Sequence, residues 1–461
     1  MFTSRGGAVL LAFVLLASAG CGDDEGSSSG DPPKACSTTE QTGCLAGLVC
    51  EEVEGGTTSC FTPVTVEGRV FDVLDAAEKG IPGARVVARD ANDAAVSTVA
   101  ITAMDGTYSL QVPARRSADG VPAKVSYTLR ADAQDYQTFP LPPRVALPID
   151  VNTAAGDPLV VKSVATDVGL IKLKTTAGLG SIAGAVLADN PGGTLVVAGK
   201  ATGIADFGGS YVIFNVPAGS DIDVRGYSAG LQLAPAKATV TAGEETAGID
   251  LVSVGAATAD VTGKVQIVNG GGASVTSVIL AVEDTFNETA ARGEAPKGLK
   301  AIGVDGAFTI NDVPDGRYVV LAAFENDGLV RDPDLGIGGT DILHITVAGQ
   351  NLDIAEGFKV TGALDVVSPG ATELKEASDP LEFSWAADSS EDHYEIRLFD
   401  AYGDMAWENL AVPDGNGTIE TPYTGDPLIP GMIYQFRAVS IGNDSVPISA
   451  TEDLKGAFIY R

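Results

Sequence analysis

Three stretches of the sequence repeat one pattern: MDGTYSLQVP at residues 104–113, FGGSYVIFNVP at 207–217 and VDGAFTINDVP at 304–314. Each has a glycine, one spacer, an aromatic residue, a strand-like alternation of apolar residues and a final Val-Pro. We expect the glycine to adopt a positive φ in a tight turn and the aromatic residue to begin an inward-facing strand. The proline ends that strand because it has no N–H to donate to a ladder.

Strand-like segments precede each repeat: VEGRVFD at 66–72, IAGAVLAD at 182–189 and VTGKVQIV at 261–268. Apolar alternation broken by Gly, Pro and Asp continues over most of the chain, and a helical period is nearly absent. The polar stretch 283–300 interrupts this pattern and is interpreted as a loop or a single helical turn. The predicted fold class is therefore all-β.

The first repeat also carries GIPGARVVARD at 80–90. Together these residues resemble carboxypeptidase regulatory-like domains, the transthyretin-like β-sandwiches. The resemblance is strongest for 64–174, extends to the second half of 258–360, and is weakest for 180–255, which lacks the Gly-Ile-Pro-type segment. It implies three tandem Ig-like or transthyretin-like β-sandwiches without catalysis of their own, of a kind common on exported proteins.

The C-terminal stretch has a different pattern. LEFSWAAD at 381–388 and LIPGMIYQFRAVSI at 428–441 resemble strands of a fibronectin type III domain. The resemblance implies that Trp385 is the core tryptophan and that the Tyr434 hydroxyl bonds back to the backbone at a strand corner. We assign this domain to 366–461.

The N-terminus has the features of a signal peptide over residues 1–20: a charge at Arg5, a short apolar run and small residues before Cys21. The run LASAGC resembles a bacterial lipobox, which implies cleavage before Cys21 and its lipidation. Gly22 then favours the outer membrane, with the periplasmic or cell-surface face left open. Residues 21–35 are polar and form a tether whose typical end-to-end distance is about 20 Å.

Residues 36–63 contain Cys36, Cys44, Cys50 and Cys60 within a segment that has few core-sized side chains. In an exported chain this predicts two disulfides that replace a core. Of the three pairings we favour Cys36–Cys50 with Cys44–Cys60. A metal site is the competing interpretation, disfavoured because the compartment is oxidising and no His or C-x-x-C pair is nearby.

The composition restricts the partners. The formal net charge is −32, with 61 acidic against 29 basic residues. Such a chain disfavours nucleic acid and anionic lipid surfaces. We expect a membrane contact only through the N-terminal lipid, and protein or glycan partners at the envelope or cell surface.

GYSAG at 226–230 matches the G-x-S-x-G pattern of hydrolase nucleophiles, with Ser228 as the nucleophile. That motif needs a strand, a sharp turn and a helix, whereas a second strand-like segment follows here. A triad also needs a histidine, and the chain has two, His344 and His393, both in other domains. We therefore predict that Ser228 is not catalytic.

Two further candidate sites are weaker. RDPDLGIGGTD at 331–341 places Asp332, Asp334 and Asp341 with intervening glycines, which is a candidate calcium loop and the chain's one candidate cofactor site. The alternative is a solvated acidic loop. Trp407 and Tyr402 are candidate platforms for sugars, although packing of Trp407 against its sandwich is the simpler interpretation.

The sequence thus predicts a lipid-anchored, non-catalytic outer-membrane protein whose domains act in adhesion, presentation or scaffolding. The alternatives are a carbohydrate-binding lipoprotein and, less favoured, a hydrolase that uses Ser228. Strands of about nine residues are roughly 30 Å long, so four sandwiches placed end to end extend on the order of 100 Å.

Overall fold

The computed structural model describes residues 36–38, 41–141, 144–268, 275–288, 292–323, 329–330, 342–355, 357–389 and 391–461. In these ranges the regular structure is β-strand, with three short 3₁₀ turns at Val151–Thr153, Val164–Thr166 and Glu283–Thr285. The all-β prediction is confirmed. No helix in the described part of the chain has the length and apolar character that crossing a membrane requires.

The first sandwich packs a sheet of order β10-β3-β6, in which β9 also pairs with β3, against a sheet of order β5-β4-β7-β8. Its strands are β3 (Val64–Asp72), β4 (Arg85–Arg89), β5 (Ala100–Ile101), β6 (Thr107–Val112), β7 (Ser126–Asp132), β8 (Ile149–Asp150), β9 (Val160–Val161) and β10 (Val168–Leu170).

The second sandwich repeats this plan, with sheets of order β14-β11-β19-β16 and β13-β12-β15-β17, and with β18 paired to β11. Its strands are β11 (Leu179–Leu187), β12 (Leu195–Ala198), β13 (Ala201–Ile204), β14 (Ser210–Pro217), β15 (Gly219–Tyr227), β16 (Leu231–Leu233), β17 (Ala236–Val240), β18 (Glu245–Thr246) and β19 (Leu251–Ala256).

The third sandwich has the same two sheets again, ordered β23-β20-β28-β25 and β22-β21-β24-β26, with β27 paired to β20. Its strands are β20 (Ala259–Val268), β21 (Thr276–Val282), β22 (Lys300–Val304), β23 (Ala307–Val313), β24 (Gly316–Ala323), β25 (Leu329–Val330), β26 (Leu343–Val347), β27 (Leu352–Asp353) and β28 (Phe358–Gly362).

The fourth sandwich differs, with a sheet of order β29-β31-β34 facing one of order β30-β37-β35-β32-β33, where β36 also pairs with β35. Its strands are β29 (Val366–Ser368), β30 (Lys375–Ala377), β31 (Glu382–Ala386), β32 (His393–Asp400), β33 (Met405–Pro413), β34 (Thr418–Pro422), β35 (Ile433–Ile441), β36 (Pro447–Ala450) and β37 (Ala457–Tyr460).

The core of the fourth sandwich forms around Trp385, which is fully buried with its ring centroid 5.5 Å from that of Tyr394. At the strand corner the Tyr434 hydroxyl accepts a hydrogen bond of 2.9 Å from the backbone N–H of Ile429. Both features match what the fibronectin-like pattern implies for these two residues.

In each of the first three sandwiches a glycine of the first strand faces the repeat's aromatic residue. Gly68 pairs with Tyr108, Gly184 with Tyr211 and Gly263 with Phe308 across antiparallel ladders. A Cβ at Gly184 would lie 1.9 Å from the Ile249 carbonyl oxygen, the same atom that accepts a 2.5 Å hydrogen bond from the Tyr211 hydroxyl. The Ile249 carbonyl therefore occupies the space that the missing side chain leaves, and the tyrosine hydroxyl binds it there.

The hydroxyl of the paired tyrosine is held in the same way in the first sandwich. Tyr108 donates a 2.6 Å hydrogen bond to the Thr166 carbonyl oxygen, and burial raises the pKa of Tyr108. Thr166 and Ile249 lie in the segments that lead to the last strands, β10 and β19. Each of these strands runs parallel to the first strand of its own sandwich. In these two sandwiches the Gly–Tyr pair thus holds the segment before the last strand close to the first strand.

The positive φ expected for the repeat glycine is found at Gly106 and Gly209, with φ of 83° and 90°. The expectation is wrong for Gly306, which does not adopt a positive φ. In the third sandwich the positive φ nearest to this turn is that of Gly303, inside β22, at 65°.

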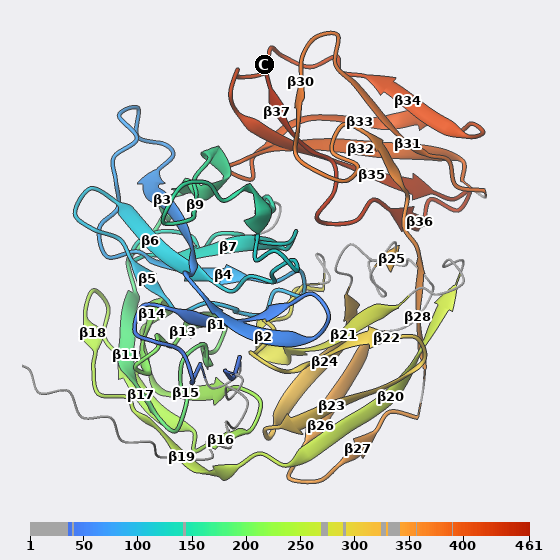
Figure 1. Ribbon diagram of the computed structural model, residues 1–461. Helices are drawn as coiled ribbons and strands as arrows, with labels where there is room; N and C mark the ends of the chain where they lie inside the picture. The colour runs from blue at the N-terminus through green and yellow to red at the C-terminus, as the bar shows by residue number, and fades with distance from the viewer. Residues whose placement is uncertain are drawn as a thin grey trace, which may run out of the picture.

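The end-to-end arrangement is also wrong. Figure 1 shows the four sandwiches gathered into one body, with the second (green) and third (yellow to gold) beside the first (blue to cyan) and the fourth (orange to red) above. One cluster of buried apolar side chains joins the first three sandwiches, and another joins the first and fourth. Between the second and third, the Tyr227 and Tyr318 rings meet edge to face at 5.9 Å.

We predict that Gly184→Ala lowers the free energy of unfolding by about 1–3 kcal/mol, because the added methyl group displaces the Ile249 carbonyl. Chemical denaturation followed by circular dichroism measures this loss. Gly306→Ala is the control, since a Cβ there meets no atom within 4 Å. Equal losses in the two variants would contradict the proposed role of the Gly–Tyr pair.

A candidate functional site at the junction of the sandwiches

Ser228 lies in a turn and not in a nucleophile elbow. The residue is buried, it follows β15 directly, and the chain continues into β16 after two residues. His344 lies in β26 of the third sandwich with Nδ1 3.0 Å from the Glu283 carboxylate. His393 begins β32 of the fourth sandwich with Nδ1 3.1 Å from the Asp392 carboxylate. Each histidine is thus held by a carboxylate of its own sandwich.

We predict that a fluorophosphonate probe does not label this protein and that Ser228→Ala leaves the labelling unchanged. The physical reason is that a serine nucleophile needs an adjacent base, whereas His344 and His393 lie in other sandwiches, each beside a carboxylate. Mass spectrometry of the probe-treated chain measures the outcome. Labelling that disappears in Ser228→Ala would contradict it.

Two sets of sequence-predicted residues lie outside the described residues. They are Cys21, the candidate lipidation site, and Asp332, Asp334 and Asp341 of the candidate calcium loop. Both therefore stay predictions.

The two candidate sugar platforms are engaged in packing. Trp407 stacks on Phe383 of its own sandwich at a centroid distance of 5.7 Å. Tyr402 meets Phe71 of the first sandwich edge to face at 5.2 Å. The face that each ring directs at these neighbours is not open to a ligand.

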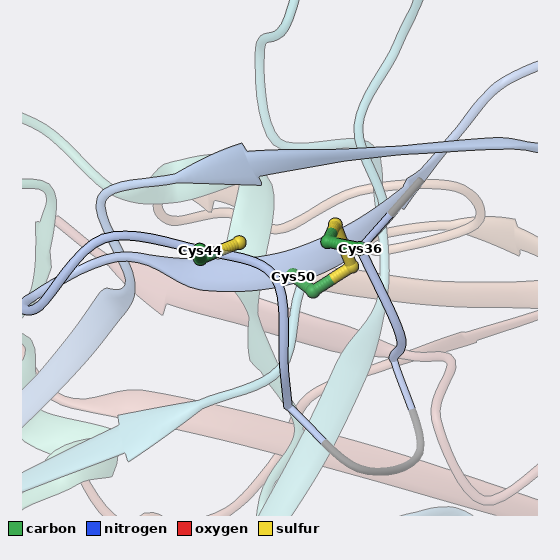
Figure 2. Close-up of side chains that lie close together, drawn as sticks. All are labelled: Cys36, Cys44 and Cys50. Atoms are coloured by element: carbon green, nitrogen blue, oxygen red, sulfur yellow. A yellow bond between two sulfur atoms is a disulfide. The ribbon is translucent and has the colours of Figure 1, made fainter. Parts of the chain in front are cut away.

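The disulfide-rich segment is a hairpin of β1 (Val49–Val53) and β2 (Thr57–Phe61), with bonds Cys36–Cys50 and Cys44–Cys60. This is the pairing favoured from the sequence. Figure 2 shows Cys36, Cys44 and Cys50 together, and their sulfur atoms lie within 4.8 Å of one another. All three are in disulfides, so no thiolate among them is free to bind a metal.

This hairpin is fixed to the first sandwich by a buried ion pair. Glu51 and Arg116 each have side chains 2% exposed, and Arg116 Nε lies 2.5 Å from the Glu51 carboxylate. The second Glu51 oxygen accepts a 2.9 Å hydrogen bond from the backbone N–H of Ala114. Burial raises the pKa of Glu51 more than the Arg116 guanidinium lowers it. The N-terminal end of the described chain is therefore held in one orientation.

The most constrained charged group of the molecule is Arg130 on β7, whose side chain is fully buried. Its guanidinium binds Asp132 of the same strand through two hydrogen bonds of 2.7 and 3.0 Å. It also donates to Thr202 Oγ1 of the second sandwich at 2.7 Å and to Glu294 of the third at 2.5 Å. Burial alone would lower the pKa of Arg130, but the Asp132 and Glu294 carboxylates raise it above its ordinary value. One side chain thus joins three sandwiches.

Residues 292–300, which we call the latch, lie along the third sandwich, end at the first residue of β22 and reach the other three sandwiches. Arg292 lies 3.3 Å from Asp93 of the first sandwich and 2.8 Å from Asp453 of the fourth. Glu294 lies between Arg130 and Arg89, and Lys300 pairs with Asp90 of the first sandwich.

The latch contacts the second sandwich mainly through its backbone and one lysine stem. The Lys297 carbonyl oxygen accepts a 3.0 Å hydrogen bond from the Ala229 N–H. The Lys297 ammonium donates to the Gly192 carbonyl oxygen at 3.1 Å. Backbone hydrogen bonds from Leu280 and Val282 of β21 keep the latch on its own sandwich. Lys300 at its end also pairs with Ile279 in the ladder between β21 and β22.

Two cavities lie at this junction. One of about 1100 Å³ is lined by the disulfide hairpin and the first, third and fourth sandwiches. The other, of about 630 Å³, is lined by all four sandwiches, with Arg292 and Glu294 in its wall. Each is lined by five basic and five acidic side chains. The junction is therefore balanced in charge, in a chain with more than twice as many acidic as basic residues.

Sequence reasoning missed this junction. The only signal was the polar stretch 283–300, which breaks the strand pattern and was interpreted as a loop or one helical turn. It contains the 3₁₀ turn Glu283–Thr285 and the whole latch. The tyrosine corner and both disulfides, in contrast, lie where the sequence placed them.

No family model and no curated protein matches the chain. Among solved structures, BcpA, the major pilin subunit of Bacillus cereus, is similar at 12% identity, covering 65% of this chain and 99% of that one, with a TM-score of 0.17. A streptococcal ancillary pilin matches at 12%, covering 65% and 98%, with a TM-score of 0.18. Two B repeat units of the Staphylococcus aureus collagen-binding protein match at 11%, covering 87% and 98%, with a TM-score of 0.16. At these scores the likeness carries no argument about this chain.

We predict that Arg130→Met destabilises the protein by about 3–5 kcal/mol, because it removes the cation shared by the buried Asp132 carboxylate and the partly buried Glu294 carboxylate, and leaves Glu294 only its 3.6 Å contact with Arg89. Calorimetric or denaturant unfolding measures the loss. Arg317→Met is the matched control, since its pair with Asp284 is largely exposed and contributes less than about 1 kcal/mol. A similar small loss in both variants would show that the junction does not depend on Arg130.

Proposed function

We propose that this chain is a lipid-anchored, non-catalytic protein of the bacterial outer membrane that presents a rigid multi-domain body to envelope or surface partners. The observation that carries the proposal is the continuous attachment from the N-terminal hairpin to all four sandwiches. Glu51–Arg116 fixes the hairpin to the first sandwich, and Arg130 with the latch fixes the other sandwiches to the first. A body attached in this way keeps its four sandwiches in one orientation relative to the hairpin.

The proposed anchor is the lipidated Cys21, fifteen residues before Cys36. A lipid there with a flexible tether keeps the body near the membrane and lets its distance and tilt vary. As part of the same proposal, the first three sandwiches are carboxypeptidase regulatory-like and the fourth is fibronectin type III-like. The supporting features are the repeated Gly–aromatic pairs and the Tyr434 corner.

Presentation is favoured over chemistry because the candidate catalytic residues are held apart. Ser228, His344 and His393 lie in the second, third and fourth sandwiches, and each histidine is paired to a carboxylate of its own sandwich. Contacts with partners would then be made by end loops and exposed strand edges, which is usual for β-sandwiches.

Protease treatment of intact and permeabilised cells tests the proposal, with an antibody against the fourth sandwich as readout. We expect the protein in the membrane fraction, with digestion in intact cells if it acts in adhesion and only after permeabilisation if it scaffolds an envelope complex. Cys21→Ser is the control and is expected to move the folded protein out of the membrane fraction. A Cys21→Ser protein that stays membrane-bound would overturn the lipid-anchor proposal.

A further inference from the structure

Electrostatic repulsion among acidic surfaces opposes the compact arrangement of the four sandwiches. The junction cavities are charge-balanced, so the excess of acidic over basic residues lies on the rest of the molecule. Charges of one sign repel over about 10 Å at 0.1 M salt and over about 30 Å at 0.01 M. Bringing four acidic sandwiches together is therefore opposed by a repulsion that grows as the salt concentration falls.

The latch supplies the groups that oppose this repulsion. Within a few residues it presents Arg292 and Lys300 to carboxylates of the first and fourth sandwiches and Glu294 to two arginines of the first. Ala295 and Leu299 add buried apolar contacts, the former beside Ala94 of the first sandwich. The latch also stays attached to its own sandwich. Leu280 and Val282 of β21 donate backbone hydrogen bonds to it, and the Glu294 N–H donates a 2.8 Å hydrogen bond to Thr285 Oγ1.

Glu294 is the residue on which the latch depends most. Its carboxylate binds Arg130 of the first sandwich and also lies 3.6 Å from Arg89 of the same sandwich. The other groups that face it are Asp132 on β7, the Thr202 side chain bound to the same guanidinium, and Asp93, which pairs with Arg89. A cation at position 294 would meet two buried guanidinium groups.

We propose that residues 292–300 are a conformational latch that sets an equilibrium between this compact body and an extended row of sandwiches. With the latch seated, opposite charges at the junction hold the sandwiches together. With the latch released, repulsion among the acidic surfaces separates them, and lower salt favours the extended form. The inference does not depend on the lipid anchor, and the rigid body of the proposed function is the state in which the latch is seated.

The direction of the salt effect distinguishes this device from an ordinary surface ion pair. Salt weakens an exposed ion pair and would loosen a body held only by such pairs. Buried pairs such as Arg130–Glu294 are screened much less, whereas the exposed acidic surfaces are screened strongly. A latch-weakened protein is therefore expected to extend at low salt and to become compact again at high salt.

The test is small-angle X-ray scattering of the full chain carrying Cys21→Ser, so that no lipid is attached, at about 0.01 M and about 1 M salt. The variant is Glu294→Lys. The matched control is Glu420→Lys, which makes the same charge change at an exposed position on β34. Glu294→Gln is the milder variant, because its amide oxygen still accepts a hydrogen bond from Arg130.

A compact body of this length has a radius of gyration of about 22 Å, and a row of sandwiches on the order of 100 Å long has about 30 Å. We expect about 22 Å for the unmutated latch and for Glu420→Lys. We expect a rise toward about 30 Å for Glu294→Lys at low salt, reversed at high salt, with Glu294→Gln between them. An unchanged circular dichroism spectrum would show that the sandwiches remain folded.

Three results would overturn the proposal. The first is a radius of gyration for Glu294→Lys that equals that of Glu420→Lys at both salt concentrations. The second is extension of Glu294→Lys at high salt only, because that is the behaviour of exposed ion pairs. The third is loss of the β-sheet spectrum together with the rise in radius, because the change would then be unfolding.

Discussion

The arrangement of this molecule depends on one buried cation. Arg130 is fully enclosed, and its guanidinium is satisfied only when groups from three sandwiches are present together. Burying a charge is unfavourable unless it is paired and hydrogen-bonded, so the first sandwich alone would expose part of this side chain to water. The second and third sandwiches are thereby coupled to the first, and the latch extends the coupling to the fourth through Arg292.

Within each of the first three sandwiches the corresponding constraint is the glycine that faces an aromatic ring. Because Gly68 and Gly184 have no side chain, a carbonyl oxygen from the last part of the same sandwich approaches the first strand closely. The tyrosine hydroxyl opposite then binds that carbonyl. Phe308 replaces the tyrosine in the third sandwich and packs against Gly263 without such a hydrogen bond.

These local features are the part of the structure that could be predicted from the sequence. The Gly-x-aromatic repeat, the strand alternation and the four cysteines act over short distances, so they predicted the sandwiches and the disulfide pairing. The junction could not be predicted in this way. Thr202 and Glu294 lie 72 and 164 residues from Arg130, and nothing in the strand SYTLRAD indicates that its arginine is buried. The end-to-end arrangement was expected from strand length alone. Sequence periodicity carries no information on how separate domains pack, so it could not correct that expectation.

The measurement that tests the account most directly is carbodiimide cross-linking of the native protein, followed by mass spectrometry. This reagent joins an amine to a carboxylate only where the two are in contact. The account predicts a cross-link between Lys300 and Asp90, which lie in different sandwiches, alongside Lys237–Asp223 within the second sandwich as the internal control. A chain that yields the control cross-link but none between sandwiches would contradict the compact arrangement.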